Sequence, residues 1–190
     1  QPDFLFTLPE LQFPEQLNCA TELLDRHVRE GRGDRACVRG PREQWTYRDL
    51  WERANRIANV LVQDMGLVPG NRVLLHAPNT PMMVACWFGI VKAGGIVVAT
   101  MPLLRTKELK PILEIGQISH ALCDASLVEE VQGATQAVPG LREIRCFNAV
   151  GSETLEVAMQ AHAPLFDNVA TAADDTCLIG FTSGTTGIPK

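Results

Sequence analysis

The clearest periodic pattern of apolar residues lies between Thr46 and Gly66, where they recur at steps of three and four. This spacing is typical of an amphipathic helix that buries one face. Thr46 followed by Asp49 resembles a capping box, which predicts that the helix begins at this point. The residues expected on its buried face are Leu50, Trp51, Ala54, Ile57, Ala58, Leu61, Val62 and Met65.

A second apolar region covers residues 82–104, and Lys92 is its only charged residue. The region is long enough to cross a bilayer as one helix. A glycine pair and a proline interrupt it, however, which favours two shorter buried elements. We therefore expect a helix over 81–93 with Thr80 as its N-cap, a strand over 96–100, and no membrane span.

Helix and strand patterns alternate along the rest of the chain. Strands are predicted over 72–76, 120–123, 144–147 and 177–181, helices over 109–117, 126–138 and 153–162, and a loop over 163–175. Pro111 lacks a backbone donor, so it fits its helix only in the opening turn. The alternation predicts an α/β fold with a largely parallel sheet, right-handed crossovers and flanking helices.

Composition and charge narrow the possible classes of protein. The chain has 190 residues, of which 46% are hydrophobic and 21% charged, as in a globular domain or part of one. Its 17 basic residues against 22 acidic ones give a net charge of −5, and no run of basic residues is present. Nucleic acid is therefore not the expected partner, because phosphate backbones select basic surfaces.

Six cysteines are spread along the chain without any C-x-x-C pair. Such a pattern indicates neither a zinc site nor a dithiol motif, and we predict no metal site. We interpret the cysteines as reduced thiols of a cytoplasmic protein.

The beginning of the chain has no basic residue before Arg26, so it does not resemble a signal peptide. We expect residues 1–17 to form an N-terminal arm. The apolar residues expected to pack this arm over the domain are Phe4, Phe6, Leu8, Leu11 and Phe13.

The end of the chain carries the candidate chemistry, because a strand pattern runs into a stretch rich in glycine and hydroxyl groups. Gly184 and Gly187 allow the backbone to turn its N–H groups toward an anion. The hydroxyl side chains add donors, and Lys190 adds a positive charge. A surface turn of the same composition is the alternative. The predicted phosphate ligands are Thr182, Ser183, Gly184, Thr185, Thr186, Gly187 and Lys190.

Two common nucleotide motifs are absent from this stretch. Pro189 stands where the Walker loop requires glycine before its lysine, and the glycine spacing does not fit G-x-G-x-x-G. His76 lies at a predicted strand end and could serve as a general base, but no nucleophile and carboxylate accompany it. We interpret His76 as a core histidine and assign no catalytic residue to this chain.

Residues 182–190 resemble the phosphate-loop signature of the acyl-adenylate-forming superfamily, which includes acid–CoA ligases and peptide-synthetase adenylation domains. Residues 45–50 are similar to the early T-Y-x-x-L element of that family, and residues 91–98 to its K-A-G-G element. The resemblance spans nearly the whole chain. It implies that the chain is the first part of the large N-terminal domain of an adenylate-forming enzyme.

Three further segments, 13–15, 18–20 and 99–105, are most similar to the branch of benzoate– and 2-aminobenzoate–CoA ligases. The resemblance implies a two-step reaction, in which ATP and Mg²⁺ activate a carboxylic acid to an acyl-adenylate. The thiol of coenzyme A then displaces AMP. In the family the loop holds the β- and γ-phosphates, so the resemblance makes Lys190 a phosphate contact or a loop anchor.

Members of this family are far longer than this chain, and their adenine, metal and ribose elements and their small C-terminal domain follow the phosphate loop. We therefore expect residues 1–190 to be an N-terminal fragment that is inactive without its own C-terminal portion. Two alternatives stay open, which are an adenylating enzyme that loads a carrier protein and a non-catalytic scaffold domain.

Overall fold

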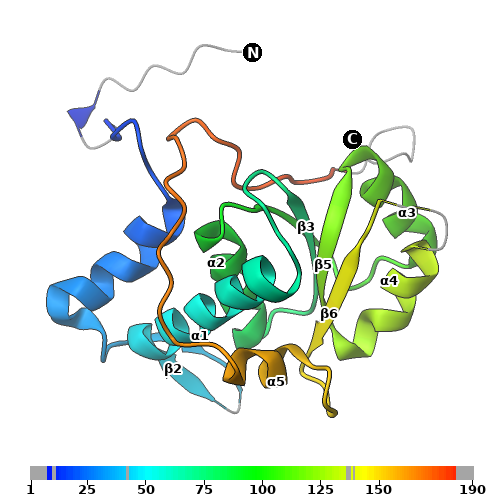
Figure 1. Cartoon of the computed structure of the whole chain (residues 1–190), viewed down its shortest axis with the longest axis horizontal. Coiled ribbons are helices and arrows are strands. Elements are labelled where there is room, and N and C mark those ends of the chain that lie inside the picture. The colour runs from blue at the N-terminus through cyan, green and yellow to red at the C-terminus, as the bar shows by residue number, and fades with distance from the viewer. Residues whose placement is uncertain (1–7, 10–11, 42, 136–137, 139, 183–190) are drawn as a thin grey trace.

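A four-stranded parallel sheet forms the centre of the molecule (Figure 1). The computed structural model describes residues 8–9, 12–41, 43–135, 138 and 140–182. The sheet has the order β4-β3-β5-β6. Its strands are β3 (Arg72–His76), β4 (Ile96–Thr100), β5 (Ile118–Asp124) and β6 (Glu143–Phe147). The predicted α/β class with a parallel sheet is confirmed.

Helices cover both faces of this sheet (Figure 1). One face carries α1 (Tyr47–Asn59), its continuation η4 (Val60–Asp64), α2 (Pro81–Lys92) and α5 (Leu155–Gln160). The other face carries α3 (Thr106–Ile115), η5 (Ala125–Leu127) and α4 (Val128–Thr135). Successive side chains of a strand point to opposite faces of the sheet. Because helices cover both faces, β3 must be apolar at successive positions, as it is at its centre.

The contact between α1 and α2 depends on a small residue. Gly89 in α2 lies so close to α1 that a Cβ atom at this position would be 2.6 Å from Cγ2 of Ile57. No side chain larger than hydrogen fits there unless the helices separate. The two helices therefore pack closely over the first face of the sheet.

The predicted capping box at the start of α1 is confirmed. The backbone N–H of Asp49 donates to Oγ1 of Thr46 at 3.1 Å, and Oδ2 of Asp49 accepts from the Thr46 backbone at 2.9 Å. The predicted limits of β3 and β4 are also confirmed, as is Thr80 as the cap of α2. Among the described residues, no helix is both long and apolar enough to span a membrane.

Other predicted boundaries were wrong. The α3 helix begins at Thr106, so Pro111 lies in its second turn instead of its opening turn. The helix predicted over 126–138 begins later than expected, because residues 125–127 form the turn η5 and the described part of α4 covers Val128–Thr135. The strand predicted over 177–181 is reduced to one parallel bridge between Leu178 and Val97. The pattern also missed the antiparallel hairpin of β1 (Ala36–Arg39) and β2 (Gln44–Thr46) and the helical segments η2 (Thr21–Asp25) and η3 (Val28–Arg32).

The described part of the N-terminal arm meets the domain through its backbone. The N–H of Leu17 donates to the Thr171 carbonyl, and the N–H of Ala173 donates to the Glu15 carbonyl, both at 2.9 Å. Leu8 is 58% exposed, so the prediction that it packs over the domain was wrong, and Phe13 is 55% exposed. Phe4, Phe6 and Leu11 lie outside the described residues.

A buried ion pair joins the N-terminal segment to α2. Nζ of Lys92, whose side chain is fully buried, lies 2.5 Å from Oδ1 of Asp25 in η2. Asn168 accepts from Lys92 through Oδ1 and donates to Asp25 and Thr21 through Nδ2. Burial lowers the pKa of Lys92, and the charge of Asp25 opposes this shift. Three segments that are distant in sequence thus meet at one lysine.

Asp49→Asn tests the capping box. Hydrogen bonds from the backbone and hydroxyl of Thr46 lower the pKa of Asp49, so the folded state favours the carboxylate. The stability that the Asp49 carboxylate contributes to the folded state is fully present above its unfolded pKa of about 4. It is lost as the pH falls through the lower pKa of the folded state. In urea titrations we expect the variant to lose about 1 kcal/mol near neutral pH and less near pH ~3. An equal loss at both pH values would contradict the assignment.

Lys92→Met tests the buried ion pair. It leaves the Asp25 carboxylate, whose side chain is 14% exposed, without its cation. We expect the free energy of unfolding to fall by about 3 kcal/mol. The matched double variant Lys92→Met/Asp25→Asn removes both charges and should recover most of this loss. If the double variant is as unstable as the single one, the unpaired carboxylate is not the cause.

Candidate functional site

The carboxyl ends of the four parallel strands lie along one edge of the sheet, named here the carboxyl edge. His76 ends β3 and is paired in register with Thr100, which ends β4. Asp124 ends β5 and is paired with Phe147, which ends β6. Open parallel sheets bind ligands in the crevice outside this edge. The polar residues gathered there are therefore the first candidates for a site.

His76 ties the ends of β3 and β4 together. Its Nδ1 lies 2.8 Å from Oγ1 of Thr100. The side chain is buried, and its Nε2 has no hydrogen-bond partner within the described part of the chain. Burial, assisted by the charge of Arg105, lowers the pKa of His76, so the neutral imidazole is favoured. The predicted core position is confirmed, although only one ring nitrogen is satisfied.

A carboxylate from α4 occupies the beginning of α3. Oε2 of Glu130 accepts from both the backbone N–H and the hydroxyl of Thr106 at 2.8 Å, and these bonds lower the pKa of Glu130. Nη1 of Arg105 lies 3.7 Å from Oε1 of Glu130. This group was not predicted from the sequence, because no local pattern relates residues 24 positions apart. Glu130 thus takes the place that an anionic ligand would need at this helix end.

Asp124 is used by the fold itself. Its Oδ1 accepts from the backbone and hydroxyl of Ser126, and its Oδ2 accepts from Nδ2 of Asn148 at 2.7 Å. Both oxygens are therefore engaged in holding the turns after β5 and β6. Within the described ranges, no group of three or more His, Cys, Asp or Glu residues could hold a metal ion.

The segment that leads to the predicted phosphate ligands runs beside β4. The Val97 N–H donates to the Cys177 carbonyl, and the Ile179 N–H donates to the Val97 carbonyl, both at 2.9 Å. Because this bridge is parallel, the chain passes Leu178 in the direction of β4, toward the carboxyl edge. Ile179 and Phe181 pack against the apolar cluster beneath α3 and α4.

Thr182 is the one predicted phosphate ligand that the structure describes, and it is exposed. The others lie outside the described residues, so their role stays a prediction. They are Ser183, Gly184, Thr185, Thr186, Gly187 and Lys190.

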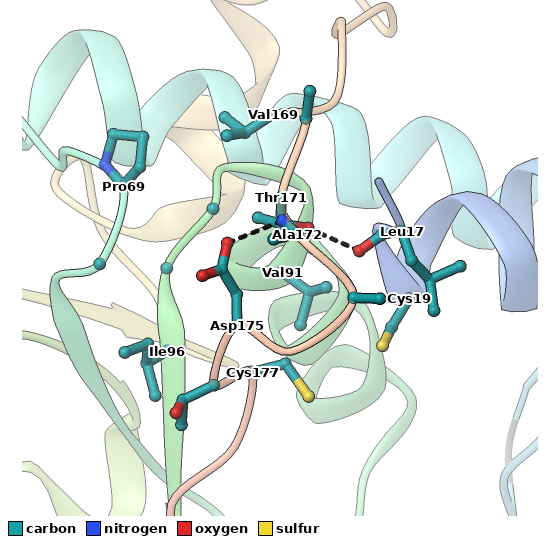
Figure 2. A pocket seen from close by; sticks show the side chains of 16 residues that line it. Leu17, Cys19, Pro69, Val91, Ile96, Val169, Thr171, Ala172, Asp175 and Cys177 are labelled. Atoms are coloured by element: carbon teal, nitrogen blue, oxygen red, sulfur yellow. Dashed lines mark hydrogen bonds between the residues drawn. The ribbon is translucent and has the colours of Figure 1, made fainter. Parts of the chain in front are cut away.

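A cavity of about 500 Å³ lies beside the beginning of β4, where the glycine pair at 94–95 leads into the strand (Figure 2). Backbone and small side chains from the segment 169–177 form much of its wall. Asp175 is the only charged residue among the described residues that line it, and Oδ2 of Asp175 accepts from the Ala172 N–H at 2.8 Å. Without a cation, this cavity is unsuited to a polyphosphate.

A second, more open cavity lies between β2, α1 and α5 and contains both arginines and glutamates. The guanidinium of Arg53 stacks over the Trp45 ring, 4.3 Å from its centre. Arg56 donates to the carbonyls of Met159 and His162. These cations hold parts of the fold together, so the cavity offers no free anion site.

A comparison with protein families gives a match to the AMP-binding enzyme model over residues 24–190. The chain belongs to the AMP-binding enzyme family. The matched region contains the sheet, all of its covering helices and the predicted phosphate ligands.

Curated relatives from two groups of CoA ligases match the chain. The benzoate–CoA ligase of Thauera aromatica is 27% identical over 184 residues, which cover 97% of this chain and 35% of that protein. The crotonobetaine/carnitine–CoA ligase of Salmonella choleraesuis is 35% identical over 164 residues, covering 77% of this chain and 30% of that protein. The chain thus spans about a third of the length of these relatives.

Solved structures share the fold. The anthranilate CoA ligase AuaEII, in complex with anthranoyl-AMP, matches with a TM-score of 0.87 and 24% identity, over 94% of this chain and 34% of that one. ATP-bound MatB from Rhodopseudomonas palustris matches with a TM-score of 0.79 and 25% identity, over 91% of this chain and 33% of that one. The architecture is therefore that of the N-terminal domain of adenylate-forming enzymes.

Histidine-ring NMR spectra recorded as a function of pH test the state of His76. We expect its midpoint below the ordinary value of 6.5, because burial disfavours the imidazolium. The stability that neutral His76 contributes is present above pH ~6.5 and is lost as the pH falls. The unfolded state then binds a proton at His76 more readily than the folded state does. A midpoint above the ordinary value would show that His76 is charged and has a carboxylate partner.

Proposed function

We propose that this chain is the nucleotide-binding part of an acid–CoA ligase. One observation carries the proposal, which is the parallel bridge between Leu178 and Val97. It directs the chain toward the carboxyl edge immediately before the predicted phosphate ligands. In a chain of the AMP-binding family, this edge is where a nucleotide would bind.

The proposed reaction has two steps. A carboxylate oxygen of the acid attacks the α-phosphorus of ATP, an acyl-adenylate forms, and pyrophosphate leaves. The sulfur of coenzyme A then attacks the acyl carbon, forms the thioester and releases AMP. The hydroxyls and backbone N–H groups of residues 182–187 and the Lys190 ammonium would hold the β- and γ-phosphates during the first step. This part of the catalysis is positioning and charge stabilisation.

We propose an aromatic acid, such as benzoate or 2-aminobenzoate, as the substrate. The match to a benzoate–CoA ligase covers 97% of this chain, and the fold is similar to that of an anthranilate CoA ligase with a TM-score of 0.87. The crotonobetaine/carnitine–CoA ligase has higher identity but matches less of the chain. Crotonobetaine is therefore the main competing acid.

The reaction also requires a metal ion and further parts of the protein, beyond what the described residues provide. No group of three or more potential metal ligands occurs among the described residues, so we assign no Mg²⁺ ligand to them and derive no step through the metal. Because the relatives are about three times as long, we propose that activity needs further parts of the kind that the relatives possess. The use of ATP and coenzyme A favours the cytoplasm as the location.

Acid-dependent exchange between ATP and pyrophosphate tests the proposal in a longer protein that contains residues 1–190 and the further parts proposed above. We expect exchange with benzoate or 2-aminobenzoate and less with crotonobetaine or a fatty acid. Residues 1–190 alone should give none. If no acid supports exchange, the proposed adenylation is wrong. Transfer of the acyl group to a carrier protein instead of coenzyme A would support a carrier-loading enzyme.

Lys190→Ala tests the phosphate contact in the longer protein. We expect the KM for ATP to rise about tenfold or more, because a charge-assisted contact is lost. Lys107→Ala removes an exposed lysine of α3 and is the matched control. Equal effects of the two substitutions on the KM would contradict the role of Lys190.

A further inference from the structure

Two cysteines that are distant in sequence line the same cavity. Cys19 follows the N-terminal arm, and Cys177 precedes the bridge to β4. Both line the 500 Å³ cavity described above, and Figure 2 shows their sulfur atoms turned toward one another. Each is a free thiol of intermediate exposure, so small molecules can reach it.

Hydrogen bonds on both sides hold the backbone of the two cysteines in place. Next to Cys19, Nδ2 of Asn18 donates to the carbonyls of Val91 and Val169 at 2.9 and 3.0 Å. The Cys177 carbonyl accepts from the Val97 N–H at 2.9 Å. The approach of the thiols is therefore set by the fold and does not depend on two free loops.

The Cys177 thiol also affects the pKa of Cys19. Burial raises the pKa of Cys19, and the neighbouring Cys177 thiol raises it further through charge and hydrogen bonding. Such an influence of Cys177 on Cys19 is expected only if the two side chains lie close together. It agrees with the arrangement in Figure 2.

We propose that Cys19 and Cys177 are a site of reversible disulfide formation. The oxidant is a low-molecular-weight disulfide such as oxidised glutathione. One cysteine loses its proton, attacks the oxidant and expels one glutathione thiolate, which leaves a mixed disulfide. The second cysteine loses its proton and attacks the sulfur of the first cysteine in the mixed disulfide, which forms the Cys19–Cys177 bond and expels the second glutathione as a thiolate. Two cysteines are oxidised, and one glutathione disulfide is reduced to two thiols.

The bond would link the N-terminal segment to the segment that leads toward Thr182. Those segments already meet through the pairing of Leu17 with Thr171, so the bond would reinforce an existing contact. It would also close a loop of more than a hundred residues, which restricts the unfolded chain. The inference does not depend on the proposed function.

The other cysteines provide internal controls. Cys123 and Cys146 are opposite one another on β5 and β6, but Cys123 is fully buried and its pKa is raised well above its ordinary value by burial. Cys86 is also fully buried, and the thiol of Cys37 donates to the Trp45 carbonyl. We therefore expect oxidation to select Cys19 and Cys177.

The test is oxidation of the purified protein with oxidised glutathione, followed by intact mass measurement and peptide mapping. The expected product has lost two hydrogen atoms, contains a peptide linked through Cys19 and Cys177, and returns to the starting mass in dithiothreitol. Cys19→Ser and Cys177→Ser should each abolish the link and leave one glutathione on the remaining cysteine. Cys146→Ser should leave the link intact.

Thermal unfolding gives a second readout. We expect the oxidised protein to melt about 5 °C or more above the reduced one, and Cys19→Ser to remove the difference. Separate glutathione adducts on Cys19 and Cys177 in the unsubstituted protein, or a link through other cysteines, would overturn the proposal.

Discussion

Parallel pairing of β3 with β4 on one side and β5 on the other is the constraint on which the rest of the structure depends. It brings the carboxyl ends of the strands to one edge and requires a covering helix between successive strands. Because both faces are covered, β3 is apolar throughout its centre. The same pairing leaves β4 with a free side, and the segment around Leu178 takes it.

Buried polar side chains then fix the segments that have no regular structure. Asn55 and Asn59 on α1 donate to carbonyls of residues 163–165, which holds the long loop along the helix. Lys92 and Asn168 hold the end of the same loop against η2. A loop with so few apolar anchors needs such partners, because its backbone groups would otherwise be buried without hydrogen bonds.

The regular elements were predictable where local chemistry decides them. Thr46 with Asp49 and Thr80 with Pro81 mark helix starts through contacts that span only a few residues, and both caps are present. The hairpin of β1 and β2 was missed, since its short strands are partly exposed and lack an apolar alternation. The strand over 177–181 was overestimated, because its pairing depends on Val97, far away in sequence.

In the candidate site, too, some features follow from local sequence and others from long-range packing. The composition and order of the hydroxyl-rich, glycine-rich end of the chain predict a phosphate motif, and this stays a prediction because residues 183–190 lie outside the described residues. The partners of His76 and Glu130 could not be predicted, because Thr100 and Thr106 reach them only through the packing of the sheet and helices. Local sequence therefore suggests a chemistry, while long-range packing decides which polar groups, such as Glu130, are already engaged by the fold.

Amide hydrogen exchange in a protein that contains residues 1–190 together with the further parts proposed above, measured with and without ATP, tests the central claim most directly. If the segment beside β4 delivers a phosphate-binding loop to the carboxyl edge, ATP will slow exchange in the peptide covering residues 178–190 and leave the cavity segment 169–175 unchanged. Protection of 169–175 with no change in 178–190, under conditions where ATP is bound, would contradict the account.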